Sequence, residues 1–179
     1  LSIARSAITA TKEYAGEAGA ILDLGATRSS LIVYDKNTVQ FSTDINFSGE
    51  LLTTAISQGL KLDREEAEKL KIKNGITYDE KYPKYLKLVA KHVETLTADI
   101  KQSLMFYKNH FPNANPVTHI TMCGGVAQTK KLGGIISRQI KITASPGNIW
   151  KNLFNPKYGE KEKAQGLSWS SAIGLAIRA

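Results

Sequence analysis

The sequence is poor in cysteine and histidine. Among its 179 residues, Cys123 is the single cysteine, and His92, His110 and His119 are far apart. A lone cysteine cannot form an intrachain disulfide, and this composition is typical of a reducing compartment. No combination of cysteine and histidine has the spacing of a zinc site. These absences argue against a disulfide scaffold and a zinc module, and they predict a cytoplasmic protein.

Long apolar runs are also missing. No segment approaches the roughly 18 uninterrupted apolar residues that a membrane span needs. The first residues show no basic-then-apolar signal pattern. Apolar residues make up 42% of the chain, which is ordinary for a globular protein with one core, or with a core and a subdomain. The sequence starts at Leu1 instead of methionine, so we expect it to be a segment of a longer protein.

Positive charge exceeds negative charge. Lys and Arg together number 24, Asp and Glu 16, and the formal net charge is +8. An anionic partner such as a nucleotide, a nucleic acid or an acidic membrane surface is one interpretation, and a solvated lysine-rich surface is the other. The lysines are spread along the chain, and the densest cluster, Lys157–Lys163, contains two glutamates. Because no basic stripe is interleaved with aromatic residues, no nucleic-acid partner is expected.

Hydrophobic periodicity predicts a short helix, an antiparallel β-meander and then three helices. Ser48 is expected to cap the first of these helices, and Asp63 with Glu66 resembles a capping box for the next. Pro83 is expected in the first turn of a long helix that reaches about His110. The predicted elements are a helix over Leu1–Lys12, strands over Ala20–Leu22, Leu31–Tyr34 and Val39–Ile45, and helices from Leu51, over Arg64–Lys73, and over Pro83–His110.

The last third of the chain alternates between strands and helices. We expect strands over Val117–Met122 and Ile140–Thr143, and helices over Gln128–Gln139 and Gly166–Arg178. The order predicts an α/β fold with a mixed sheet. We expect residues 1–46 and 117–179 to form one discontinuous core subdomain and residues 47–116 to form an inserted, mainly helical subdomain. Cys123 and Trp169 are interpreted as packing residues.

Two glycine turns are the candidate ligand-binding elements. The first, Asp23–Ser30, follows an apolar strand, and its backbone N–H groups and hydroxyls can surround phosphate oxygens. Asp23 lies where a carboxylate can face Mg²⁺ or a water bound to phosphate. Because many β-hairpins contain Asp and Gly, a plain hairpin is the alternative. The second turn, Cys123–Ala127, also follows an apolar run, and Gly124 and Gly125 allow a ligand to approach the backbone closely. A tight turn that needs glycine only for packing is the alternative here.

A third element, the helical segment Ala67–Lys71, lies between the two turns. The order of the three elements resembles the second half of the actin-like (ribonuclease H-like) ATPase fold. The resemblance implies that the first turn is a phosphate-binding loop. It also implies that Asp23 orients Mg²⁺ through water, or orients the attacking water as the candidate catalytic residue of the full protein. It implies that Glu68 and Lys71 contact the adenosine, although charges on an exposed helix face are usually only solvated. It further implies nucleotide contacts from Gly25, Ala26, Thr27, Arg28 and Ser29 in the first turn and from Gly124, Gly125 and Val126 in the second.

Within that superfamily the chain is similar to the PilM-like proteins of type IV pilus assembly, over nearly its whole length. FtsA-like division proteins share the fold, but the long helix and the C-terminus of this sequence resemble them less. The matching segments are Leu22–Thr27, Phe41–Ile45, Gly49–Lys71, Asp99–Tyr107, Cys123–Ala127 and Ala172–Arg178.

The resemblance implies a protein that binds ATP and Mg²⁺ between two halves and acts as a switch or scaffold at the inner membrane. The first half, with the other phosphate loop and most of the groove for a PilN-like peptide, would lie outside this sequence. We therefore expect no ATP hydrolysis by this chain alone and at most weak hydrolysis by the full protein. Self-association stays open. The alternatives are an FtsA-like or sugar-kinase-like protein and a scaffold that works without nucleotide.

Overall fold

A computed structural model describes residues 2–8, 16–148, 150, 152 and 166–177. Its centre is a five-stranded mixed sheet with the strand order β3-β2-β1-β4-β5. The first three strands are antiparallel neighbours, whereas β4 and β5 run parallel to β1. The strands are β1 (Ala18–Leu24), β2 (Ser29–Asp35), β3 (Thr38–Ile45), β4 (Val117–Cys123) and β5 (Thr143–Pro146).

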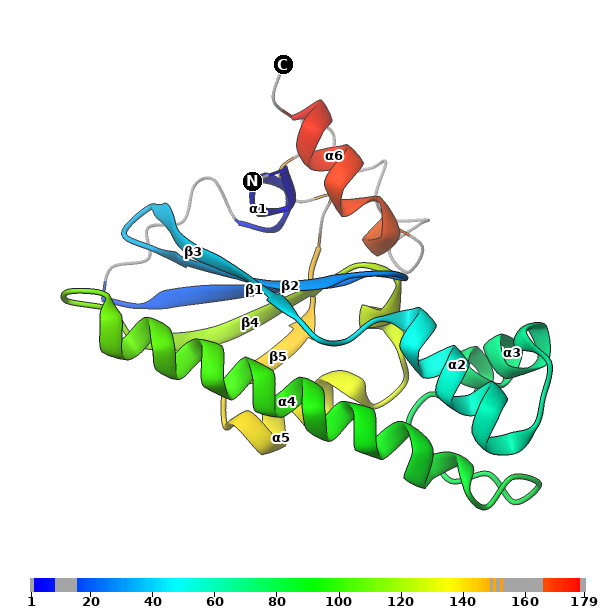
Figure 1. Cartoon of the computed structure of the whole chain (residues 1–179). Helices are drawn as coiled ribbons and strands as arrows, with labels where there is room; N and C mark the ends of the chain where they lie inside the picture. Colours follow the sequence, from blue (N-terminus) through cyan, green and yellow to red (C-terminus); the bar gives the residue numbers. More distant parts are fainter. Residues whose placement is uncertain (1, 9–15, 149, 151, 153–165, 178–179) are drawn as a thin grey trace.

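Helices cover both faces of this sheet (Figure 1). On one face, β1 and β2 share a buried core with the long helix α4. Leu22 and Leu31 of the strands belong to the same buried cluster as Val89 of α4. On the other face, Ile21 and Ile32 pack with the N-terminal helix α1. The helices are α1 (Ser2–Ala7), α2 (Gly49–Leu60), α3 (Arg64–Asn74), α4 (Tyr85–His110), α5 (Leu132–Ile140) and α6 (Ser170–Ala176), with 3₁₀ turns η1 (Gly125–Gln128) and η3 (Gly166–Trp169).

The predicted α/β class and the meander are confirmed, and so are the helix caps. The Ser48 side chain accepts a hydrogen bond from Leu51 N–H, and Asp63 and Glu66 form the expected capping box of α3. Pro83, however, was expected in the first turn of the long helix, and this was wrong: α4 begins at Tyr85 after the cap residue Lys84, so Pro83 lies before the helix. One core cluster joins α2, α3 and α4 to the sheet, so the division into two subdomains stays a prediction.

Two predicted boundaries in the last third were wrong. Lys131 has a φ of 68°, so the helix expected over Gln128–Gln139 is divided into η1 and the later α5. Lys141, with a φ of 61°, ends α5 and donates its N–H to Ser137 O. Because this left-handed residue separates helix from strand, β5 begins at Thr143 instead of Ile140. The Lys157–Lys163 cluster and the expected ends of the first and last helices, at Lys12 and Arg178, lie outside the described residues.

Candidate functional site

A cleft of about 1000 Å³ opens where the first turn, the start of α2, one face of α3, η1 and η3 meet. Five of its residues lie on α3 at positions that share one helix face. The lining residues are Ala26, Gly49, Glu50, Thr53, Arg64, Glu65, Glu68, Lys71, Ile72, Gly125, Val126, Gln128, Thr129, Ser168 and Trp169. The cleft therefore brings together all three elements that the sequence singled out.

The first turn is held by backbone hydrogen bonds to itself and to α2. Gly25 N–H donates to Arg28 O at 3.0 Å, and Gly49 N–H donates to Gly25 O at 3.0 Å. Glu50 N–H donates to Ala26 O at 2.8 Å. The amides of residues 26–28 have no hydrogen-bond acceptor among the described residues, and all three residues are exposed. Three unoccupied N–H groups in one fixed turn can bind an anion.

Ser29 is in a different position from the turn residues before it. It lies at the start of β2, is 3% exposed, and shares the strand face of Leu31 because side chains alternate along a strand. Its hydroxyl has no hydrogen-bond partner in the described part of the chain. Of the first turn, Ala26 lines the cleft. The contacts predicted for Gly25, Thr27, Arg28 and Ser29 stay predictions.

Asp23 is the penultimate residue of β1 and lies beside the second turn. Burial raises the pKa of its carboxyl group. The two turns are in contact, because a Cβ atom at Gly124 would lie 2.8 Å from Asp23 Oδ1. The described residues contain no group of three or more His, Cys, Asp or Glu that could hold a metal ion. A magnesium ion at Asp23 would therefore need phosphate oxygens or water as further ligands.

Gly124 and Gly125 serve different purposes. Gly124 has a φ of 84°, and a Cβ atom there would lie 2.4 Å from Leu24 O. Gly124 N–H also donates to Leu167 O at 3.0 Å, so this residue packs the turn between β1 and η3. Gly125 is exposed in the cleft, where a Cβ atom would meet Ser168 Oγ at 3.2 Å. Of the two glycines, Gly125 is thus the one that opens onto the cleft.

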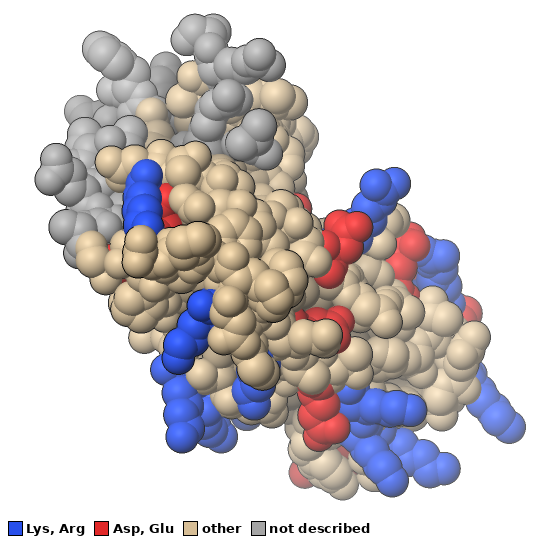
Figure 2. Space-filling view, turned by 60° about the vertical axis from the view of Figure 1, so that its left-hand side comes forward, with Lys and Arg blue, Asp and Glu red and all other residues tan. Residues whose placement is uncertain are grey.

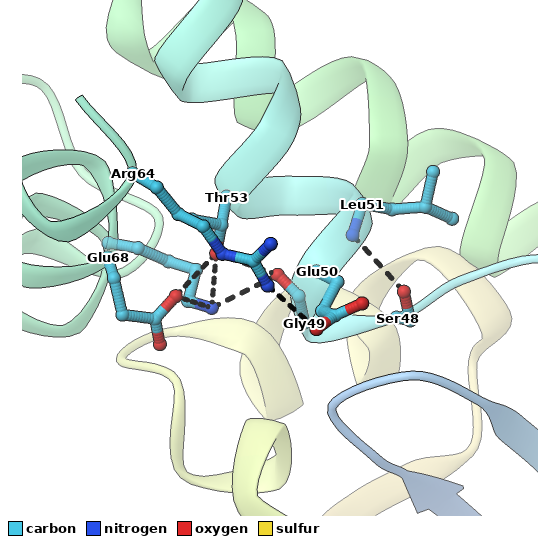
Figure 3. Close-up of polar contacts among 8 residues, drawn as sticks. Ser48, Gly49, Glu50, Leu51, Thr53, Arg64 and Glu68 are labelled. Atoms are coloured by element: carbon cyan, nitrogen blue, oxygen red, sulfur yellow. Dashed lines mark hydrogen bonds and ion pairs between the residues drawn. The ribbon is translucent and has the colours of Figure 1, made fainter. Parts of the chain in front are cut away.

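Glu68 and Lys71 belong to one hydrogen-bond network with the start of α2. Figure 3 labels Glu68, Thr53 and Gly49 in this network. Lys71 Nζ donates to Glu68 Oε2 at 2.7 Å, to Thr53 Oγ1 at 2.8 Å and to Gly49 O at 3.0 Å. Thr53 Oγ1 also donates to Glu68 Oε2. Because a lysine ammonium has three protons, Lys71 is fully engaged within the protein, and it is 8% exposed.

This network leaves one face of Glu68 for a ligand. Burial raises the pKa of its carboxyl group, but the hydrogen bonds from Lys71 and Thr53 and the charges of Lys71 and Arg64 outweigh burial, so the pKa is lowered. The Glu68 side chain is 44% exposed, and its Oε1 atom has no partner among the described residues. Glu68 therefore presents an ionised oxygen to the cleft, and Lys71 fixes its position.

The rim of the cleft is charged. Arg64 Nη2 lies 2.8 Å from Glu50 Oε1, and both side chains are largely exposed, so this ion pair adds little stability. In the space-filling view, Lys and Arg side chains stand out from several separate parts of the surface, with Asp and Glu between some of them (Figure 2). No single basic patch dominates this face.

Sequence reasoning missed several residues of the cleft. Trp169 was expected to be a packing residue, but it is 62% exposed and lines the cleft. Ile72 is 68% exposed on the same α3 face as Glu68, four residues away. An isoleucine on a charged helix face was a signal that could have identified it. Together they give the cleft two apolar surfaces.

Comparison with solved structures identifies the class of fold. The chain is similar to the PilM–PilN type IV pilus biogenesis complex, with a TM-score of 0.76 and 23% identity over 91% of this chain and 46% of that chain. It also resembles MreB 5 of Spiroplasma citri bound to AMPPNP, with a TM-score of 0.69 and 12% identity, over 98% of this chain and 56% of that one. The fold is that of the actin-like ATPases.

The family can be stated more narrowly. The sequence matches the family of the type IV pilus assembly protein PilM over residues 3–179, so this chain belongs to that family. A further structural relative is the ethanolamine utilization protein EutJ from Carboxydothermus hydrogenoformans, with a TM-score of 0.64 and 16% identity, over 99% of this chain and 52% of that one. The chain thus spans about half the length of these relatives. No curated protein matches it. None of its described helices is long and apolar enough to span a bilayer.

Proposed function

We propose that this chain supplies one wall of an ATP–Mg²⁺ cleft and acts in type IV pilus assembly as a nucleotide-dependent switch. One observation carries the proposal: free amides, an ionised carboxylate oxygen and an open glycine line or border a single cleft of about 1000 Å³. The family match supports the pilus-assembly role over the FtsA-like alternative. The AMPPNP complex of MreB 5 supports a nucleotide as the ligand of this cleft, since that relative shares the fold.

The residues of the cleft fit the parts of a nucleotide. The amides of residues 26–28 would bind phosphate oxygens, and Asp23 would face the magnesium ion through water. Glu68 Oε1 would accept hydrogen bonds from ribose hydroxyls. Gly125 and Val126 would lie against the nucleoside, and Ile72 and Trp169 would border the base. Lys71 would act through Glu68, because its three donors are already used.

ATP with Mg²⁺ would supply a charged bridge between this wall and a second wall outside this sequence. A ligand shifts a conformational equilibrium by binding one state better than the other. The cleft of this chain would therefore favour a closed arrangement of the two walls. We propose that the closed protein binds inner-membrane partners from the cytoplasmic side, among them a PilN-like peptide held mainly by the other wall. Hydrolysis by this wall alone is not expected.

A scaffold that works without nucleotide is the second candidate. The network of Lys71, Glu68 and Thr53 favours it, because these side chains satisfy one another without a ligand. Nucleotide binding by the protein separates the two candidates.

The test compares Mg-ATP binding by full-length proteins that carry Gly125→Leu or Gly134→Leu. A side chain at Gly125 would enter the cleft, whereas a Cβ atom at Gly134 meets nothing within 4 Å. Calorimetry should show at least a tenfold loss of affinity for Gly125→Leu and an unchanged affinity for Gly134→Leu. Absence of binding by the parent would overturn the proposal in favour of the scaffold. Equal binding by both variants would place the nucleotide elsewhere.

A further inference from the structure

Strand β3 has a free edge. It pairs with β2 through seven residue pairs and lies at the end of the strand order β3-β2-β1-β4-β5. Among the described strands, none pairs with its other side. An edge strand presents a row of unpaired N–H and C=O groups, which is a template for a further strand.

The hydrogen-bond pattern shows which residues of β3 present these groups. In an antiparallel pair, residues alternate between those that bond to the partner and those that point away. Gly25 N–H donates to Arg28 O across the β1–β2 turn, so these two residues form a hydrogen-bonded pair. Counting from this pair shows which residues of β2 bond to β1 and which bond to β3. In the register of β2 with β3, the backbone N–H and C=O groups of Thr43 therefore point toward β2. Those of Ser42 and Asp44 point outward, away from the sheet.

Asn46 confirms the direction of this row. It follows Ser42 and Asp44 at the same two-residue spacing, and its N–H donates to Asp99 Oδ2 of α4 at 3.1 Å. Ser42 and Asp44 are both exposed. The Asp44 carbonyl oxygen receives one long contact, from Thr43 Oγ1 at 3.4 Å. The outward row is therefore available for hydrogen bonding.

A groove runs along this edge. Its volume is about 530 Å³, and it lies between β3 and the flank of α4. Figure 1 shows β3 at the edge of the sheet and α4 beneath it. From α4 come four residues at helical spacing, of which Phe106 is 47% exposed. The lining residues are Phe41, Ser42, Thr43, Asp44, Asn46, Asp99, Gln102, Ser103 and Phe106.

The groove has a chemical character of its own. Its described charged residues are Asp44 and Asp99, although the whole chain has a net charge of +8. Phe41 and Phe106 add aromatic surface, with ring centroids 5.8 Å apart. A complementary occupant is therefore basic where it faces the carboxylates and apolar where it faces Phe106.

We infer that β3 binds an extended, basic segment of a partner protein as an added strand. Main-chain hydrogen bonds to Ser42 and Asp44 supply affinity, and lysine or arginine side chains opposite Asp44 and Asp99 supply selectivity. A second copy of β3 is a poorer occupant, because Thr38–Ile45 contains Asp44 and no Lys or Arg. Like charges on paired strands destabilise the pairing.

The probe is a capped ten-residue peptide in which lysine alternates with valine and one phenylalanine. A second peptide has glutamate in place of every lysine, and a third is the lysine peptide with alternate backbone nitrogens methylated. Amide hydrogen exchange in the full-length protein is the readout. The lysine peptide should slow the exchange of the Ser42 and Asp44 amides at least tenfold and leave Thr43, already bonded to β2, almost unchanged.

Two variants make the test specific. Ser42→Pro removes an outward N–H without removing a bond to β2, and proline is tolerated on edge strands. It should reduce peptide affinity at least tenfold, whereas Ser42→Ala should keep it, and a thermal melt checks that both fold. Equal affinity for the three peptides, or full affinity in Ser42→Pro, would overturn the inference. Amides that are already protected in the free protein, in a concentration-dependent way, would assign the edge to a second copy and also overturn it.

Discussion

Replacing Gly124 with alanine tests the geometry that joins the two turns. The residue has a φ of 84° and a ψ of 164°, a region that is almost restricted to glycine and costs other residues about 1–3 kcal/mol. The added Cβ atom would also lie 2.4 Å from Leu24 O and 2.7 Å from Leu24 C. These are backbone atoms of β1 and cannot move aside without distorting the sheet.

The two effects together should lower the free energy of unfolding by about 3 kcal/mol, with the strain contributing most of it. For a protein of this size, each kcal/mol corresponds to about 2–4 °C in the melting temperature, so a decrease of about 6–12 °C is expected. Urea unfolding followed by circular dichroism gives the free energy, and a thermal scan gives the shift.

Gly134→Ala is the matched control. Gly134 lies within α5, and a Cβ atom there meets nothing within 4 Å. Since alanine is favoured over glycine in a helix by about 0.5–1 kcal/mol, this variant should be slightly more stable than the parent. If Gly124→Ala lost less than about 1 kcal/mol, the close contact of the second turn with β1 would be refuted.

Three further predictions concern other polar groups and the cleft. Asp35 accepts hydrogen bonds from Tyr107 Oη at 2.5 Å and from Asn115; burial raises its pKa, but these bonds outweigh burial and lower it. Its contribution to stability is therefore complete above its unfolded pKa of about 3.9 and is lost as pH falls through the folded value. Tyr107→Phe should cost about 1.5–3 kcal/mol near pH 7, measured by urea unfolding, and less at pH 3; an equal cost at both pH values would contradict this. Lys71→Met should raise the Glu68 pKa, measured by NMR, because a donor and a positive charge are lost; an unchanged value would argue against the network. Trp169→Ala should weaken Mg-ATP binding at least fivefold, since stacking on a base is worth about 1–3 kcal/mol, and an unchanged affinity would place the base elsewhere.

Local signals were sufficient for most of the fold. Ser48 and Asp63 mark helix starts because their side chains bond to N–H groups two or three residues away, and such contacts depend only on nearby sequence. The boundary of β5 was missed because the prediction depended on local signals alone. Ile140 and Ile142 are residue types typical of strands. Lys141 between them takes a left-handed backbone conformation, which a lysine side chain gives no reason to expect.

The cleft was predictable in part. The glycine turns and Glu68 could be identified because each has a local pattern and a resemblance to actin-like proteins. The roles within the pattern depend on contacts between distant segments. Lys71 bonds to Gly49, 22 residues earlier, and Gly124 packs against Leu24, so neither role is visible along the chain. Trp169 lines the cleft because η3 lies beside η1, which is a property of the fold.

The most direct test of the nucleotide cleft is the response of individual backbone amides to Mg-ATP. Amide NMR shifts of the full-length protein would be recorded with Mg-ATP and, separately, with adenosine. If the nucleotide binds in this cleft, Mg-ATP should shift the amides of residues 26–28 and Gly125, whereas adenosine should shift Gly125 and leave residues 26–28 unchanged. Shifts confined to residues outside the cleft, or none at saturating Mg-ATP, would contradict it.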